Sequence, residues 1–360
     1  MKSTRSSKLV GILKNEESIS ADNWINACHN LKINYKVIDI LSSNWLDEIL
    51  SVNYDFFVHF PPARYEYSKN MFDERLYIIN KVLGYNTFPT FEESIIYENK
   101  KMLSYFLKAK NIPHANTFVF YDYEEAVYFV DTANYPIVAK TSIGATGSGV
   151  KIIENRHSAF SYIKLAFKGS GIRRRIGPNR VTGNPGRWLI KALESPNYFK
   201  NRLSLYTKIF KNVQKNYVIF QEYIPHEFEW KMVKIGKSYF AHKKVKVGQK
   251  ASGSKVKQFE MPDNKLLNFI ENLCKQNNFN SVDIDLFENN GNYLINEIQC
   301  VFGIPYGYLM KIDDKKGRLI KKNNDWLFEE GDFTVNECCN LRLLTAIDIF
   351  GYQNNIDWKF

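Results

Sequence analysis

Lys140 stands between a short apolar run and a loop rich in glycine and hydroxyl side chains, residue types that suit phosphate chemistry. The apolar run before it, and a second one from Val150, favour strands. Three glycines within six residues let the backbone turn sharply, so several N–H groups can point into one concavity. A lysine beside such a loop suits phosphate oxygens, although the loop alone is more often a plain hairpin. The loop residues are Thr141, Ser142, Gly144, Thr146, Gly147, Ser148 and Gly149.

Two familiar phosphate loops are excluded. A Walker loop ends in Gly-Lys-Ser or Gly-Lys-Thr, and a dinucleotide fingerprint is followed by a helix. Here neither ending is present, and a strand pattern follows the glycines. The stretch therefore predicts a strand, a glycine-rich turn and a second strand.

Carboxylates gather on a second stretch near the end of the chain. Two apolar runs on either side of Asn289-Asn290-Gly291 predict a β-hairpin. Asp283 lies on one arm, with Asp285 on the same face, and Glu297 and Gln299 lie on the other arm. In an antiparallel pair, residues of matching parity project from one face, so these oxygens could converge on Mg²⁺. Solvated surface acids are the alternative, but the apolar neighbours indicate buried strands, where an unpaired carboxylate is costly.

The positive charge of the chain is concentrated in two segments. The net charge is +11, and residues 161–216 hold thirteen Lys or Arg against one acid, Glu194. Residues 231–257 hold nine lysines and no acid. This distribution indicates a localised anionic ligand, although lysines on solvated loops would give the same count. Aromatic residues within the first segment leave nucleic acid as an alternative partner.

The order of the apolar runs predicts an α/β chain. Strands at residues 9–13, 35–40 and 55–60 alternate with helices at 23–31 and 45–50, which favours a parallel sheet. We expect three parts along the 360 residues. They are an N-terminal α/β domain at 1–90, a central part at 91–224 with a basic insertion at 168–215, and a C-terminal part at 225–360 that carries the hairpin.

Further elements follow from the same patterns. Residues 229–235 and 239–247 should form an antiparallel pair around Gly236-Lys237. Strands are expected at 118–120 and 217–224, and residues 168–191 should be a loop. Helices are expected at residues 69–83, 98–109, 124–132, 155–167, 203–213, 265–276 and 334–349.

Cysteine usage and hydropathy favour the cytoplasm. The five cysteines show no CxxC spacing, and two of them are adjacent, which fits neither a disulfide framework nor a zinc site. The apolar run after the basic N-terminus is too short for a signal peptide, and no window approaches the about 18 apolar residues of a membrane span. We therefore expect a cytoplasmic protein without a transmembrane helix.

The separate motifs, taken in order from about residue 85 to 305, resemble the ATP-grasp superfamily, which includes D-alanine–D-alanine ligases, glutathione synthetases and ribosomal-protein glutamate ligases. Four pieces carry the resemblance, and their order and spacing make it specific. They are Asn99-Lys100 with Leu107, residues 111–113 and Thr117; residues 136–150; residues 221–225; and residues 281–283 with 296–299. The resemblance implies an ATP-grasp fold behind a Rossmann-like N-terminal domain, with ATP and Mg²⁺ as cofactors.

The resemblance also implies roles for individual residues. Lys100 and Lys140 would hold ATP phosphates, with the glycine-rich loop folding over them. Glu222, Tyr223 and Ile224 would meet the adenine, and Glu229 or Glu227 the ribose. Asp283, Glu297 and Gln299 would bind magnesium. Lys231 and Lys243 would lie near the transferred phosphate or the acceptor.

The sequence departs from the family pattern at four positions. Asn99 replaces the usual Asp and Thr141 the usual Pro, and neither should abolish nucleotide binding. Gln299 stands where Asn is usual, so its amide oxygen reaches further by one methylene. Cys300 begins a replacement of the usual Pro-Gly ending, and we interpret it as a packing residue.

Carboxylate–amine ligation through an acyl phosphate is the reaction that the resemblance implies. Arginine forks bind carboxylates and phosphates, so an anionic substrate, such as a sugar acid, a nucleotide-linked or lipid-linked saccharide or an acidic peptide, is expected beside an amine. The tentative substrate residues are Arg173, Arg174, Arg175, Ser252 and Lys255. A kinase acting on an anionic polyol, a non-catalytic ATP-binding module and a nucleic-acid binder are the alternatives. A homodimer is also open, since ligases of this type often dimerise.

Overall fold

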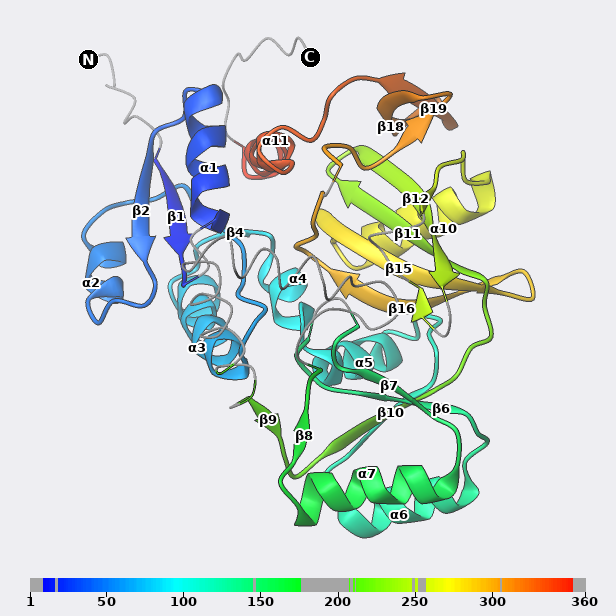
Figure 1. Cartoon of the computed structure of the whole chain (residues 1–360). Helices are drawn as coiled ribbons and strands as arrows, with labels where there is room; N and C mark the ends of the chain where they lie inside the picture. The colour runs from blue at the N-terminus through cyan, green and yellow to red at the C-terminus, as the bar shows by residue number, and fades with distance from the viewer. Residues whose placement is uncertain are drawn as a thin grey trace, which may run out of the picture.

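A computed structural model of the chain describes residues 9–16, 19–144, 147–175, 207, 210, 212–247, 250–251, 257–304 and 306–351. Figure 1 shows an N-terminal sheet with its helices, a large sheet beside it, and a smaller sheet with two helices below both. The predicted mixed α/β class is confirmed. Most of the predicted helix at 203–213 and of the predicted loop at 168–191 lies outside the described residues. Three predicted site residues also lie outside them: Thr146, Ser252 and Lys255.

The N-terminal sheet has the strand order β2-β1-β3-β4, and all its pairs are parallel. The predicted alternation of strands and helices is therefore confirmed. β4 was not predicted, because two residues are too short to show a strand pattern. The strands are β1 (Val10–Lys14), β2 (Tyr35–Asp39), β3 (Phe56–His59) and β4 (Thr87–Phe88). The helices are α1 (Ile19–Asn30), α2 (Trp45–Leu50) and α3 (Glu66–Tyr77), which continues as a π-helical turn, η1 (Ile78–Val82).

The smaller sheet has the order β5-β10-β6-β7 and is antiparallel throughout. Helices α6 (Tyr123–Thr132) and α7 (Arg156–Lys168) share one apolar core with its strands. The side chains of Asp122 and Asn155 cap these helices, which explains where each begins. The strands are β5 (Thr117–Phe120), β6 (Ile137–Lys140), β7 (Val150–Ile153) and β10 (Val218–Glu222); a short pair, β8 (Ile172–Arg173) and β9 (Val213–Gln214), lies next to it in sequence.

The large sheet has the order β16-β15-β11-β12-β18-β17, with β13 and β14 pairing with β12 and β19 with β18. Its two predicted hairpins are confirmed, and helix α10 (Asn264–Gln276) packs into its core. The strands after residue 310 were not predicted, since lysines and acids hide their alternation. The strands are β11 (Phe228–Ile235), β12 (Ser238–Val247), β13 (Lys250–Ala251), β14 (Lys257–Gln258), β15 (Ser281–Asn289), β16 (Asn292–Gln299), β17 (Lys311–Ile312), β18 (Lys315–Lys322) and β19 (Asp325–Glu330).

Three helices pack across the boundaries expected at residues 90 and 224. Helices α4 (Phe91–Ile96) and α5 (Lys100–Ala109) join the core of the large sheet, and Glu93 of α4 accepts hydrogen bonds from the backbone at the start of β15. Helix α11 (Cys339–Ile349) joins the core of the N-terminal sheet. It begins five residues later than predicted at 334, after Cys338 with φ of 65°. These helices lie where they do because each one buries its apolar face against the core of a sheet.

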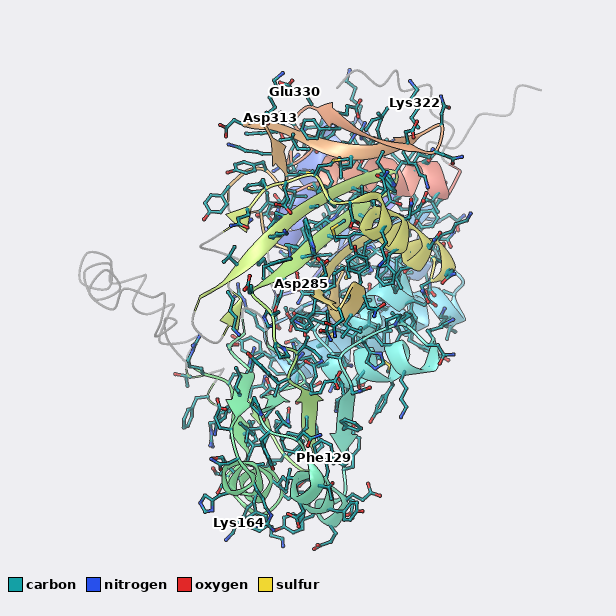
Figure 2. All side chains as sticks on the ribbon, turned by 90° about the vertical axis from the view of Figure 1, so that its right-hand side faces the viewer. Phe129, Lys164, Asp285, Asp313, Lys322 and Glu330 are labelled. Atoms are coloured by element: carbon teal, nitrogen blue, oxygen red, sulfur yellow. The ribbon has the colours of Figure 1, made fainter. Side chains whose placement is uncertain are left out.

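The smaller sheet and the large sheet meet in the middle of the molecule, where Lys140 of β6 contacts Asn296 of β16. In Figure 2, Asp285 of the large sheet lies at mid-height, while Phe129 and Lys164 mark the end formed by α6 and α7. Asp313, Lys322 and Glu330 mark the opposite end. Within the described part of the chain, no helix has the length and apolar character to cross a membrane.

Candidate active site

The glycine-rich loop joins β6 to β7 and is closed at its base by backbone pairing. Lys140, the last residue of β6, pairs with Val150, the first of β7. The N–H of Thr141 donates to the carbonyl of Gly149 at 2.8 Å. Gly149 has to be glycine, because a Cβ there would lie 1.9 Å from Oγ1 of Thr141. The structure therefore has the predicted strand, turn and strand.

Several loop groups already have partners inside the protein. The N–H of Ser142 donates to Oε1 of Gln214 at 2.9 Å, and the N–H of Gly144 donates to Oε2 of Glu98 at 3.0 Å. The carbonyl of Ser148 accepts from the N–H of Arg175 at 2.9 Å. Gly147 adopts a left-handed conformation, with φ of 66°. The loop is thus tied to its surroundings on both sides.

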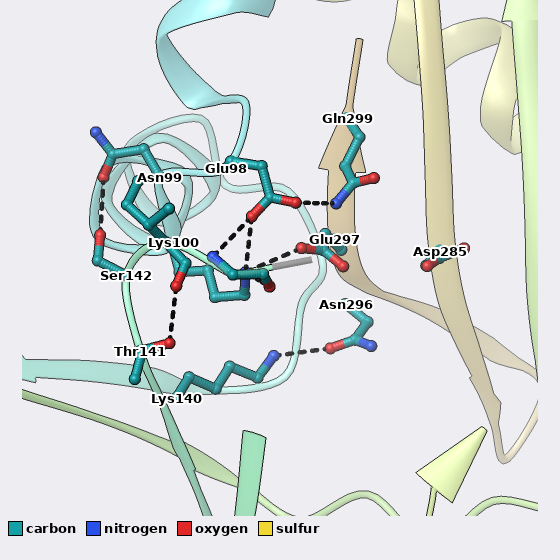
Figure 3. A network of polar contacts seen from close by, with 12 residues as sticks. Glu98, Asn99, Lys100, Lys140, Thr141, Ser142, Asp285, Asn296, Glu297 and Gln299 are labelled. Atoms are coloured by element: carbon teal, nitrogen blue, oxygen red, sulfur yellow. Dashed lines mark hydrogen bonds and ion pairs between the residues drawn. The ribbon is translucent and has the colours of Figure 1, made fainter. Parts of the chain in front are cut away.

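Lys140 points from the smaller sheet toward the large sheet (Figure 3). Its Nζ donates to Oδ1 of Asn296 on β16 at 3.0 Å. Burial lowers the pKa of Lys140 to about 8, although the charge of Glu297 opposes this change. Within the described residues, the hydrogen-bond partner of this buried ammonium is an amide oxygen, so the ammonium gains by meeting an anion.

Lys100 comes to the same place from the first turn of α5. Asn99 caps that helix by accepting from the N–H of Met102 at 3.2 Å, so the departure from Asp keeps the capping function. Nζ of Lys100 lies 3.2 Å from Glu297 and 3.6 Å from Glu98, and it donates to the carbonyl of Gly144 at 3.3 Å. Burial lowers the pKa of Lys100, but the two carboxylates outweigh burial and raise it.

Glu98 is a site residue that sequence reasoning missed. It is 3% exposed and left-handed, with φ of 47°, which is rare for a glutamate. One carboxylate oxygen accepts from Gly144, and the other accepts from Nε2 of Gln299 at 3.3 Å (Figure 3). Burial raises the pKa of Glu98 against the influence of Lys100. In the sequence, the indication that Glu98 belongs to the site was its position directly before Asn99-Lys100.

The carboxylate hairpin has a register that pairs Asp285 with Glu297 and Asp283 with Gln299. All four side chains therefore lie on one face of the ladder, in two pairs separated by the pair Ile284–Ile298, as the parity argument predicted. Burial raises the pKa of Asp283 to about 6 despite the nearby Lys231. Burial also opposes ionisation of Asp285, but Lys244 and Lys231 outweigh it and lower its pKa.

Lysines of the neighbouring strands neutralise these acids. Lys231 on β11 pairs with Asp283, and Lys244 on β12 pairs with Asp285. Nζ of Lys244 also lies 2.8 Å from Glu229, whose other oxygen accepts from Asn296 at 3.4 Å. One continuous polar network therefore runs from Lys140 through Asn296 and Glu229 to Lys244.

The structure does not bring Lys243, predicted as a catalytic lysine, to this network. Lys243 pairs with Trp230 in the ladder, and its Nζ lies 4.9 Å from the centroid of that ring and 2.5 Å from Glu260. Side chains alternate along a strand, so the next residue, Lys244, takes the side of the sheet that faces Lys140. The two-residue turn at Gly236-Lys237 fixed this register and could have identified Lys244 in advance.

The predicted adenine and ribose segment lies at the end of β10. Glu222 accepts from the backbone N–H and the side-chain amide of Asn116, each at 3.0 Å. Oη of Tyr223 accepts from Lys246 at 2.7 Å, and Ile224 is buried. Of the two ribose candidates, Glu229 lies in the polar network, whereas Glu227 is exposed to solvent.

The arginine run leaves the smaller sheet beside the glycine-rich loop. The guanidinium of Arg174 donates to the carbonyl of Arg64, and a Cβ on Gly144 would lie 2.8 Å from its Cδ. Arg175 meets the loop through its backbone. Arg173 instead donates to the carbonyl of Phe210 at 3.3 Å. The structure thus places Arg174 against the loop and turns Arg173 away.

The donor set near Glu297 fits Mg²⁺. Among the residues that the structure describes, no three His, Cys, Asp or Glu side chains form a metal-binding group. However, Asp285 lies opposite Glu297, with Gln299 two residues along, and Oδ1 of Asp285 is buried without a hydrogen-bond partner in the described part. Two carboxylates and an amide oxygen are ligands that Mg²⁺ accepts. The register therefore adds Asp285 to the predicted ligands Asp283, Glu297 and Gln299.

Cys300 follows the hairpin and is fully buried. Burial raises the pKa of its thiol, so a nucleophilic thiolate is disfavoured. The other four cysteines are buried as well, and all five are free thiols. The interpretation of Cys300 as a packing residue agrees with this position.

Residues 99–174 match the family described as the carbamoyl-phosphate synthase L chain, ATP binding domain. That segment contains Lys100, Lys140, the glycine-rich loop and Arg174. No curated protein sequence matches the chain.

Solved structures are similar to this chain at low sequence identity. D-alanine–D-alanine ligase from Bacillus anthracis is 12% identical with a TM-score of 0.51, over 96% of this chain and 99% of that one. An N5-carboxyaminoimidazole ribonucleotide synthetase in its ADP complex is 12% identical with a TM-score of 0.51, over 84% and 72%. The biotin carboxylase domain of 2-oxoglutarate carboxylase from Hydrogenobacter thermophilus is 13% identical with a TM-score of 0.50, over 84% and 66%.

At this sequence identity, the similarity to these structures is a similarity of fold. The chain has the ATP-grasp fold that its motifs led us to expect, and over residues 99–174 the family match agrees with that expectation.

Proposed function

We propose that this protein is an ATP-dependent ligase that joins a carboxylate to an amine through an acyl phosphate. The observation that carries the proposal is the meeting of two groups of residues from distant parts of the chain. Lys100 and Lys140, from the segment that matches an ATP-binding domain, lie against Glu297 and Asn296 of the hairpin. The structural neighbours named as ligase and synthetase support the same class of reaction.

Lys100 and Lys140 would bind the phosphate oxygens of ATP. Both ammonium groups are held by protein oxygens that nucleotide phosphates could replace. In this buried setting, charge-assisted hydrogen bonds to phosphate are stronger than in water. The N–H of Gly144 would then exchange the carboxylate of Glu98 for a phosphate oxygen.

Asp285, Glu297 and Gln299 would hold Mg²⁺, which supplies positive charge beside the transferred phosphoryl group when bound. Asp283 remains a predicted ligand, and its pairing with Lys231 places a lysine next to the metal residues. The protein itself contributes position and charge, so a nucleophilic side chain is not required.

The substrate carboxylate would approach on the side of Lys231. This lysine lies on the face of the large sheet that carries Asp283 and Asp285. The two basic segments of the sequence favour an anionic substrate. The homodimer and the cytoplasmic location stay predictions, and nucleic acid stays the less favoured partner.

The reaction can be tested by ADP release from Mg²⁺-ATP with a pool of sugar acids, amino acids and acidic peptides, with and without hydroxylamine. Hydroxylamine traps an acyl phosphate as a hydroxamate, so we expect ADP release with formation of that product. A phosphorylated product that is inert to hydroxylamine would instead identify a kinase. ATP binding without turnover on any pool member would favour the binding module.

Lys140→Ala should lower ADP release by at least about a hundredfold, because removing a buried transition-state charge costs about 3 kcal/mol or more. Glu297→Ala should have an effect of similar size. Lys243→Ala is the matched control, since it removes a lysine from the opposite face of the same sheet. Far-ultraviolet circular dichroism would verify that all three variants are folded, and normal rates in Lys140→Ala would refute the assignment.

A further inference from the structure

Lys257 lies on the face of the large sheet that carries Lys244, which we call the site face. It is in β14 and pairs with Lys244 of β12, so both side chains project from the same face. Its Nζ lies 5.1 Å from the ring centroid of Tyr306. The sequence analysis did not identify Lys257, because the sequence of a lysine-rich segment does not distinguish one lysine from another.

Lys257 lacks a counter-ion within the described residues, where no carboxylate lies within ion-pair distance of it. Its lysine neighbours differ in this respect, since Lys231 pairs with Asp283 and Lys244 with Asp285. Burial, together with the charges of Lys231 and Lys244, lowers the pKa of Lys257 to about 8. An anion from outside the protein would relieve this repulsion.

Aromatic rings extend from Lys257 along one edge of the site. We call Phe259, Tyr306 and Tyr308 the aromatic row. The rings of Tyr306 and Tyr308 are 6.1 Å apart, and those of Phe259 and Tyr308 are 5.5 Å apart. Tyr306 is 48% exposed, so part of an aromatic side chain is accessible to solvent beside a cation. Two further lysines, Lys311 and Lys316, lie 4.7 and 5.8 Å from the ring of Tyr308.

His242 lies buried beside the aromatic row, with its ring 5.5 Å from that of Phe259. It lies opposite Lys231 in the ladder, and its Nδ1 contacts the carbonyl of Leu309 at 3.1 Å. Burial keeps the pKa of His242 well below its usual value, so the ring is neutral. A neutral ring that donates from Nδ1 presents a lone pair at Nε2, and that atom is buried without a partner in the described part. Because this atom is buried, it is not part of the surface that a ligand could touch.

We propose that Lys257 and the aromatic row form a subsite for the sugar ring and the charged group of an acidic saccharide. The C–H face of a sugar ring packs on an aromatic ring, and its carboxylate or phosphate pairs with an ammonium group. Lys257 and Tyr306 provide these two partners close together. An acidic peptide needs the cations but not the exposed aromatic side chain.

The proposal rests on the proposed function for the reaction at the neighbouring ATP site, and it adds the class of substrate. It places the sugar beyond Lys231, on the side of Lys257.

The test is calorimetric titration of the full chain with tri-galacturonic acid, and separately with Mg²⁺-ATP. Lys257→Met should weaken the affinity for tri-galacturonic acid about tenfold, and Tyr306→Ala several-fold, while both variants keep their affinity for Mg²⁺-ATP. Lys257→Arg, which keeps the charge, should retain most of the affinity. Lys243→Met is the matched control and should bind as the unmodified protein does.

Equal affinity of Lys257→Met and the unmodified protein would overturn the subsite, as would an equal loss in Lys243→Met. Tighter binding of tri-glutamate or of oligothymidylate than of tri-galacturonic acid would also overturn it, in favour of a peptide or a nucleic acid. No binding of tri-galacturonic acid would do the same. If Mg²⁺-ATP fails to bind while tri-galacturonic acid binds through Lys257, the proposed function fails and the subsite stands.

Discussion

The two faces of the large sheet are built from the same strands but have opposite characters. On one face, Met232 and Ile284 are fully buried in the apolar core that also contains α10. On the other face, Lys244 pairs with Asp285, and Lys231 pairs with Asp283. Side chains alternate at every residue of a strand, so core and site are separated by the thickness of one sheet.

The comparison shows that the site face is stabilised by ion pairs, in which lysines neutralise buried carboxylates. Each buried acid on it needs a nearby cation, because an unpaired charge there would be costly. Lys100, which is expected to bind phosphate, pairs with Glu297 in the same way, so a charge that stabilises the free protein would also receive the ligand. The core face is stabilised mainly by apolar packing and should respond to mutation in a different way.

Lys244→Met should give the largest loss of stability. It would leave Asp285 and Glu229 without their shared cation, and breaking such a buried network costs about 3–5 kcal/mol. Urea denaturation monitored by circular dichroism measures the free energy of unfolding. We also expect weaker Mg²⁺-ATP binding, since two uncompensated carboxylates would repel phosphate. A loss below about 1 kcal/mol would show that the network does not stabilise this face.

The affinity for an acidic saccharide should fall as the pH rises. The pKa of Lys257 is about 8, so its ammonium is charged at pH 7 and neutral at pH 9. Lys231, Lys244 and Asp283 are the charged groups that face it, and Lys244 stays charged because Asp285 and Glu229 outweigh burial and raise its pKa. We expect about a tenfold loss for tri-galacturonic acid between these pH values, which corresponds to about 1.4 kcal/mol. Lys257→Arg should remove most of this dependence.

Ile284→Val tests the core face. Removing one buried methylene group from a packed core costs about 0.5–1.5 kcal/mol. Stability measured by urea denaturation should fall by that amount, while the affinity for Mg²⁺-ATP stays the same. A loss of nucleotide affinity in this variant would mean that the two faces are coupled.

Lys243→Met should have the smallest effect. Its partner Glu260 has a side chain that is 48% exposed, so the ion pair contributes less than about 1 kcal/mol. Neither ADP release nor Mg²⁺-ATP affinity should change measurably. The contrast with Lys244→Met, one residue away, is the sharpest test of the difference between the faces.

Much of the fold and part of the site could be predicted from the sequence. Apolar alternation located the two hairpins of the large sheet, and the spacing of strands and helices predicted the parallel N-terminal sheet. The glycines after Lys140 indicated the loop. These signals are local, because a strand or turn is recognised from the pattern of residue types within a short segment of the chain.

Glu98 and Lys257 could not be found in this way. Glu98 becomes a site residue only because α4 and α5 pack on the large sheet, which brings Gly144 and Gln299 to its two oxygens. Lys257 becomes notable only through the short pairing of β14 with β12. Contacts between distant segments leave no periodic trace in either segment.

The sequence by itself determined the elements, the chemistry of their residues and the face on which most of them project. The tertiary structure alone decided which lysine meets which carboxylate. Lys100 and Glu297 are almost two hundred positions apart in the chain, yet their charged atoms lie 3.2 Å apart. The reason is physical: periodicity follows from bonds along the chain, whereas a site between sheets follows from how apolar surfaces are buried against one another.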